Sequence, residues 1–338
     1  MKHSPHPAIL FTTASLVLVF LLALNILCGS VHLPFVKIVS ALTGAETDPV
    51  TRYIIIESRL PQALTALLCG ATLAASGLVL QTLFQNPLAD PSILGVNSGA
   101  SLGVAIVMLL LGGSVVTMGA VLSGFLLIVA AAFAGALSII ALLALLANYV
   151  RSNITLLIIG IMISYITSSV ISLLNYSATE QGVHSYVMWG LGNFGGVSLK
   201  AMPFFSIAMT ICTVFCITLM KPLNALLLGN RYACNLGFNI KRIRNTMLIS
   251  TGLISALTTA FCGPISFIGL AVPHITRMVS RTANNRTLMP LTLLFGGIIG
   301  LTCNWVCSLP SDGTLIPLNV VTPLFGVPVI LYVLVTRR

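Results

Sequence analysis

The chain has 338 residues, of which 57% are hydrophobic and 7% are charged, and its mean hydropathy is +1.07. Soluble domains carry roughly 25% charged residues, so this composition excludes a soluble protein. A membrane-spanning helix needs roughly 20 residues, so the length accommodates about ten spans and leaves no room for a sizeable soluble domain. We therefore predict an all-α integral membrane protein in which residues 1–338 form a single transmembrane domain.

The formal net charge of +10 is of the kind found in nucleic-acid-binding proteins, but its distribution favours a membrane protein. With the N-terminus in the cytoplasm and alternating spans, 12 of the 16 basic residues fall on the cytoplasmic side and five of the 6 acidic residues fall outside. Cytoplasmic loops of membrane proteins carry such an excess of Lys and Arg. We therefore expect a lipid bilayer around the chain and no nucleic-acid partner.

The first apolar run follows a lysine and has no A-x-A-like cleavage site, so we predict a retained first helix. Residues 60–83 are apolar and rich in small residues such as Gly70 and Gly77, which let helices pack closely in lipid. Pro87 and Pro91 then forbid a continuous helix, so the chain must turn. Residues 115–147 are apolar throughout and predict one long, tilted helix.

The predicted spans and connections follow in chain order. The spans are about residues 9–29, 60–83, 93–111, 115–147, 156–175, 201–220, 245–262, 264–274, 288–308 and 317–335. The connections include an external segment at 30–58, an external turn at 112–114, an internal loop with Arg151, and a basic cytoplasmic interval at 221–244. Spans 2–5 and 7–10 each begin with a small-residue helix that leads to a Pro-containing corner, so we expect two related halves of opposite orientation, as in the inverted repeats common in transporters.

Within the basic interval, Gly229 and Gly237 each follow a leucine and precede a polar stretch. Glycine commonly ends a helix because it adopts positive φ without strain, so two short helices are expected here. The alternative is an ordinary basic cytoplasmic loop.

The sequence offers little chemistry of its own. Ionisable side chains are almost absent at membrane depth, which argues against a proton- or sodium-coupled secondary transporter, the rival of another class. No Gly-Lys dipeptide occurs, so there is no phosphate-binding loop, and no H-E-x-x-H motif indicates a membrane-embedded enzyme. No C-x-x-C pair occurs either. We expect no enzymatic activity, no metal and no cofactor, and energy supplied by a partner subunit.

Two long motifs carry a family resemblance. Residues 59–95 contain RLP, then GATLAASG, then QTLFQNPLADPSILG, and residues 263–277 read GPISFIGLAVPHITR. Both blocks, in this order, resemble the FecCD/BtuC-type ABC importer permeases. The resemblance implies a type II ABC importer permease fold and ATP hydrolysis by partner subunits.

The resemblance also implies roles for individual residues. It makes 221–244 the loop that couples to the ATPase, with the residues Leu228, Gly229, Arg231, Ala233, Leu236 and Gly237. It makes four residues a cytoplasmic gate, namely Asn86, Leu88, Asn153 and Ile154. The alternative for the gate is that Asn86-Pro87 simply caps a helix end.

Three further residues, Pro273, His274 and Arg277, belong to the second motif, where we expect His274 to make a hydrogen bond at a helix start. Relatives use arginines to receive acids of a soluble binding protein, and Arg59 matches the first of these. Gln62 and Ser308 stand where relatives carry the others, and Asn304 replaces an Asp. The alternative is that Arg59 only anchors the outer end of its helix.

The implied assembly is a homodimer with two ATP-binding cassette subunits and an extracytoplasmic binding protein, in the bacterial cytoplasmic (inner) membrane. The implied cargo is an iron chelate, either a siderophore complex or haem. Cobalamin is the alternative within the same family.

Overall fold

The computed structural model describes residues 7–45, 48–110, 116–117, 120–121, 124–150, 152–310 and 316–336. Contacts divide the chain into two compact units. The first comprises Met1–Leu78, Asn193–Ile217 and Ser266–Arg338, and the second comprises Val79–Gly192 and Thr218–Ile265. The predicted external turn at 112–114, the predicted cytoplasmic Arg151 and the C-terminal pair Arg337-Arg338 lie outside the described residues.

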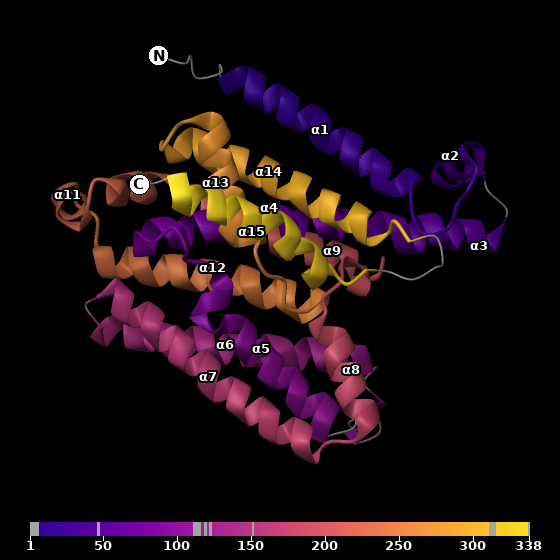
Figure 1. The fold of residues 1–338 in the computed structure, drawn as a ribbon, viewed down its shortest axis with the longest axis horizontal. Helices are drawn as coiled ribbons and strands as arrows, with labels where there is room; N and C mark the ends of the chain where they lie inside the picture. Colours follow the sequence, from indigo (N-terminus) through magenta and orange to yellow (C-terminus); the bar gives the residue numbers. More distant parts are fainter. Residues whose placement is uncertain are drawn as a thin grey trace. The chain divides into compact units, whose positions relative to one another are not determined.

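In the first unit, helices from both ends of the chain lie side by side (Figure 1). α1 (Pro7–Leu27) packs along α14 (Asn285–Cys307), and α13 (Ile268–Ser280) packs against α14 and α15 (Leu318–Thr336). The other elements are α2 (Phe35–Thr43), α3 (Pro49–Arg52), the π-helical η1 (Tyr53–Arg59), most of α4 (Leu60–Phe84), η4 (Phe194–Gly196) and α9 (Met202–Thr218).

Glycines bring α4 into backbone contact with α14 and α13. A Cβ on Gly70 would lie 2.2 Å from the carbonyl oxygen of Gly296, and one on Gly77 would lie 1.8 Å from that of Gly269. Any larger residue would therefore push the helices apart. The small residues of the apolar run 60–83 thus have the packing role that the sequence predicts.

In the second unit, the helix pair α5 (Val96–Ala105) and α12 (Ile240–Cys262) packs against α6 (Gly124–Tyr149), and α5 also contacts α7 (Asn153–Ser177) (Figure 1). The other elements are the end of α4, η2 (Pro91–Leu94), η3 (Ile106–Leu110), β1 (Val116–Thr117), β2 (Ala120–Val121), α8 (Glu180–Gly190), α10 (Met220–Leu227) and α11 (Asn230–Asn235). The prediction of an all-helical membrane protein is confirmed, apart from the β1–β2 hairpin of two residues per strand.

The described residues contain fewer helices of membrane-spanning length than the ten spans that the sequence predicts. Six of the described helices are long and apolar enough to cross a membrane, and a seventh results if α9 and α10, bent by 43°, form one span. Two shorter apolar helices, Val96–Leu110 and Leu318–Val333, fall below that length. The count of ten spans stays a prediction.

The predicted second span, residues 60–83, coincides with α4, and the helix continues upstream of it through η1 and α3 to Pro49. The Asp48 side chain accepts hydrogen bonds from the Val50 amide at 3.2 Å and the Thr51 hydroxyl at 2.7 Å. An N-cap Asp followed by Pro at the first helical position is a strong start signal. Residues 49–58 of the predicted external segment are therefore helical.

The apolar run 115–147 is not one helix. Val116 pairs with Val121 in an antiparallel hairpin, and α6 begins only at Gly124. Uniform hydropathy does not distinguish a strand from a helix in such a run, which explains the error.

Two more predicted boundaries were wrong. Residues 188–196, where the family resemblance implies a short external helix, form only the end of α8 and η4, because α8 already starts at Glu180, where the Thr179 hydroxyl accepts a hydrogen bond from the Gly182 amide at 3.2 Å. The eighth span, expected at 264–274, is α13, which begins at Ile268 after Phe267 adopts a left-handed φ of 70°.

Candidate gate, coupling segment and outer pocket

The corner after α4 is a tight turn built from its own side chains. Gln85 adopts a left-handed φ of 49°, which ends the helix. The Asn86 side-chain oxygen then accepts a hydrogen bond from the Leu88 amide at 2.9 Å. Pro91 starts η2, as the prolines predict, and Leu88 remains 38% exposed.

The start of α7 is bound to this corner. The Asn153 side-chain amide donates a hydrogen bond of 2.7 Å to the carbonyl oxygen of Leu83, in the last turn of α4. The next residue, Ile154, is 68% exposed. The structure thus brings the Asn86–Leu88 turn and the Asn153–Ile154 pair together, and their role as a gate stays a prediction.

The predicted coupling segment consists of two short helices that meet at glycines. α10 is followed by Gly229 with φ of 100°, and α11 is followed by Gly237 with φ of 85°. The Phe238 amide donates to the Ala233 carbonyl at 3.1 Å, which closes the end of α11. The expected glycine positions are confirmed. The expected loop is shorter, because α12 already begins at Ile240.

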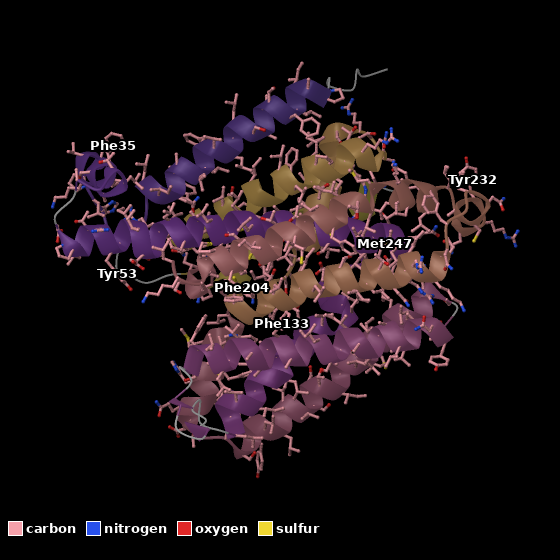
Figure 2. All side chains as sticks on the ribbon, turned by 180° about the vertical axis from the view of Figure 1, so that it is seen from behind. Phe35, Tyr53, Phe133, Phe204, Tyr232 and Met247 are labelled. Carbon is pink, nitrogen blue, oxygen red and sulfur yellow. The ribbon has the colours of Figure 1, made fainter. Side chains whose placement is uncertain are left out.

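One side of this segment is apolar and exposed. Leu228 is 65% exposed, Tyr232 48% and Leu236 55%, whereas Ala233 is fully buried. Figure 2 shows Tyr232 at the outer edge of its helix. Arg231, on the same short helix, is also exposed. A long contact of 3.5 Å from the Gln85 side-chain amide to the Leu226 carbonyl joins the corner to α10.

The second motif lies in α13 of the first unit. Pro273 and His274 are buried in the interior of this helix, and Arg277 is partly buried in its last turn. The expected helix-start position of His274 was wrong, because α13 begins at Ile268.

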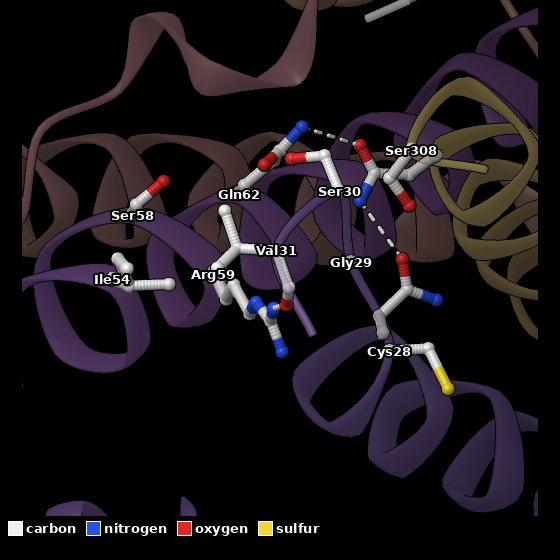
Figure 3. Close-up of a pocket in the computed structure, with 11 residues that line it drawn as sticks. Cys28, Gly29, Ser30, Val31, Ile54, Ser58, Arg59, Gln62 and Ser308 are labelled. Carbon is white, nitrogen blue, oxygen red and sulfur yellow. Dashed lines mark hydrogen bonds between the residues drawn. The ribbon is translucent and has the colours of Figure 1, made fainter. Parts of the chain in front are cut away.

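A polar pocket of about 150 Å³ lies at one end of α1, α4 and α14 (Figure 3). A chain of amides lines it. The Gln62 amide donates to the Asn304 side-chain oxygen at 3.0 Å, and Asn304 donates to that of Asn25 at 2.8 Å. Asn25 in turn donates to the Leu301 carbonyl at 3.0 Å. Gln62 and Asn304, which stand where relatives carry charged residues, are therefore hydrogen-bonded to each other.

Arg59 borders the same pocket but is only 7% exposed. Its guanidinium donates to the carbonyls of Ile26 and Leu27, each at 3.0 Å, and also to that of Val31. A Cβ on Gly29 would lie 2.8 Å from the guanidinium Nε, so this loop encloses the cation. These contacts favour the anchor role, and docking by Arg59 stays a prediction.

A wider cavity of about 400 Å³ in the second unit has an apolar lining with several hydroxyl groups in it. Its lining residues are Ser92, Ile93, Ser98, Ile161, Ser164, Tyr165 and Ser168. No charged side chain is among them. None of these positions is predicted as a site from the sequence, although several serines in one apolar helix are a visible signal.

Asp90, at the entrance to η2, is a buried acid outside the spans. Burial raises the pKa of its carboxyl to about 6, and the Ser92 hydroxyl, which donates to it at 2.6 Å, partly offsets that rise. The carboxyl is therefore still mostly ionised at neutral pH, but burial makes that charge unfavourable for the folded state.

Comparison with known proteins agrees with this architecture. A sequence model of the FecCD transport family matches residues 16–336. The chain belongs to the FecCD transport family. Members are multi-pass permeases of ABC importers, which work with ATP-binding subunits and a binding protein.

Individual FecCD relatives differ in their named cargo. The molybdate import system permease MolB of Haemophilus influenzae is 34% identical over 97% of this chain and 95% of its own length. The vitamin B12 import system permease BtuC of Salmonella typhi is 36% identical over 82% of each chain. A solved inward-facing structure of a metal-chelate type ABC transporter superposes with a TM-score of 0.83 and 31% identity, over 98% of this chain and 100% of that one.

Arg59→Ala separates anchoring from docking in this FecCD permease. Loss of the bonds to the end of α1 should lower the free energy of unfolding by roughly 2–4 kcal/mol, because charged hydrogen bonds are lost and carbonyls are left unpaired. Thermal melting of the purified protein measures this, with the exposed Arg52→Ala as control. Normal melting together with weaker binding-protein affinity at low salt would refute the anchor role.

Asp90→Asn should stabilise the protein in a pH-dependent way. The folded pKa of about 6 exceeds the ordinary 3.8, so the native state binds the proton more tightly, and wild-type stability falls as pH rises from 3.8 to about 6. The Asn variant keeps an acceptor for Ser92 without the charge. Its melting temperature should exceed that of the wild type at pH 7.5, and the difference should shrink as the pH is lowered and vanish below pH 3.8. Equal melting at pH 7.5 would contradict this prediction.

Proposed function

We propose that this chain is the membrane permease of an importer that moves a metal chelate, an iron–siderophore complex or haem, into the cytoplasm. Two copies form the translocation path, with each chain acting as one permease domain. Two ATP-binding cassette subunits supply the energy, and an extracytoplasmic binding protein delivers the cargo to the inner membrane.

The observation that carries the proposal is the exposed apolar side of α10 and α11. Leu228 follows α10, Tyr232 lies in α11 and Leu236 follows it; all three are outside the apolar spans and about half exposed or more. Contiguous apolar surface in water marks an interaction site. The chain has no phosphate-binding loop, so a nucleotide-hydrolysing partner that covers this surface supplies what the sequence lacks.

The contacts around the corner support a gate that responds to that partner. The corner carries Asn86 and Leu88 and contacts α10 through Gln85, while Asn153 binds it from α7. A displacement of α10 would thus reach the Leu88 and Ile154 side chains through side-chain-to-backbone bonds alone.

Two observations support a chelate as cargo. The solved relative is of the metal-chelate type, and the cavity beside α7 presents neutral hydroxyl groups rather than charges. Such a lining suits a bulky ligand that is released by conformational change. Among the described residues, the one buried acid, Asp90, lies at a corner and not inside a span, which disfavours ion coupling.

Transport by the reconstituted complex tests the cargo. Proteoliposomes that contain the permease, its ATPase and its binding protein should accumulate labelled iron–siderophore or haem only when ATP is present. Transport of cobalamin or molybdate instead would show that the proposed cargo is wrong, but ATP-driven import would still stand. Uptake driven by a proton or sodium gradient without ATP would overturn the proposal.

Leu228→Asp combined with Leu236→Asp tests the coupling surface. Two charges on the exposed apolar side should abolish binding of the ATPase subunit and lower ATP hydrolysis at least tenfold, because buried unpaired charges are costly in an interface. Phe35→Asp is the matched control, since Phe35 is equally exposed at 65% on α2. Co-purification and ATPase assays measure both effects. A double variant that still binds the ATPase would mean that this surface is not the coupling site.

A further inference from the structure

A buried arginine joins the first turns of α12 to the last turn of α6. Arg244 is 5% exposed, and its guanidinium donates to the carbonyl of Ala147. The next residue, Asn245, donates to the Asn148 side-chain oxygen at 3.0 Å. The two helices thus share two adjacent polar contacts at one end.

The partner of Arg244 is a helix end. Ala147 lies in the last turn of α6, where carbonyls lack partners within the helix and a cation is favoured by the helix dipole. Yet one carbonyl is small compensation for a buried guanidinium, and its Nε has no hydrogen-bond partner among the described residues. Packing alone does not explain an arginine at this position.

The position of Arg244 in the chain suggests its use. On one side, α12 follows the coupling segment directly, since α11 ends at Asn235 and the Asn239 side chain caps α12 by accepting from the Arg242 amide at 3.1 Å. On the other side, α6 leads directly to Asn153, which binds the carbonyl of Leu83. Arg244 therefore connects the helix after the coupling segment with the helix before the gate.

The coupling segment also contacts the corner directly. The Gln85 side-chain amide donates to the Leu226 carbonyl at 3.5 Å. A hydrogen bond of that length contributes little. The bonds of Arg244 and Asn245 form a second connection, which holds the start of α12 to the end of α6, the helix that precedes α7.

We propose that Arg244, assisted by Asn245, is a positioning residue that passes movement of the coupling segment to the gate. It keeps the end of α6 fixed to the start of α12, so that a shift of α12 carries Asn153 and Ile154 with it. The inference rests on the proposed function and adds a residue outside both the coupling surface and the gate.

The test compares Arg244→Met with Arg242→Met in the reconstituted complex. Arg242 is exposed in the same turn of α12 and so serves as the matched control. Arg244→Met should still bind the ATPase and hydrolyse ATP, but transport per ATP should fall about tenfold, within the range of coupling energies between sites. Arg244→Lys, which keeps the charge and one donor nitrogen, should restore part of the transport per ATP.

A second pair of variants keeps the test decisive if Arg244→Met does not fold. Asn245→Ala and Asn148→Ala remove the partly exposed contact at little cost to the fold, and each should lower transport per ATP about threefold, with no larger loss when both are combined. If Arg244→Met folds and transports as much per ATP as the wild type, the proposal is overturned. If Arg244→Met does not fold, wild-type transport per ATP in the two asparagine variants overturns it. Loss of ATPase binding in Leu228→Asp/Leu236→Asp tests the coupling surface independently.

Discussion

The carbonyl groups at helix ends are the constraint that organises the polar contacts of this protein. A helix leaves its last carbonyls without partners, and an apolar surrounding makes unpaired carbonyls costly. Long polar side chains from other helices supply the missing donors: Arg59 at the end of α1, Asn153 at the end of α4 and Arg244 at the end of α6. Each such bond joins elements that are distant in the sequence. The few polar side chains of an apolar chain thereby fix how its helices meet.

Between these ends, glycine-mediated contacts make the helix groups rigid. Where backbones touch, as at Gly70 and Gly296 or at Gly99 and Gly135, no side chain can rearrange to absorb a displacement. Movement then concentrates in the joints between helices. Gly229 is such a joint, because it has a positive φ and open space around its Cα. A displaced coupling segment would therefore move whole helices rather than deform them.

Local sequence signals predicted the joints well and the long-range contacts poorly. Proline and glycine chemistry is local, so the corner before Pro91 and the helix ends at Gly229 and Gly237 could be predicted from their neighbours. The early helix start was also readable, since Asp48-Pro49 is a capping signal. Which carbonyl a buried arginine reaches depends on the packing of helices far apart in sequence. Arg244 therefore looked like one basic loop residue among several, and Arg59 like an exposed docking residue.

The polar side chains at these helix ends differ in how well their donors match the carbonyls that they reach. Where donors and acceptors match, the contact is structural; where they do not, the side chain needs a functional explanation. Asn153 uses one amide for one carbonyl, and Arg59 uses its guanidinium for three carbonyls grouped at the end of α1. Both side chains match their acceptors, so satisfying the backbone explains them. Arg244 has the same guanidinium but donates to a single carbonyl, and its Nε is buried without a partner. A glutamine could satisfy that carbonyl at a lower desolvation cost. The charge of Arg244 beside the last carbonyls of α6 suits a contact that must keep the end of α6 fixed to the start of α12 while the coupling segment moves.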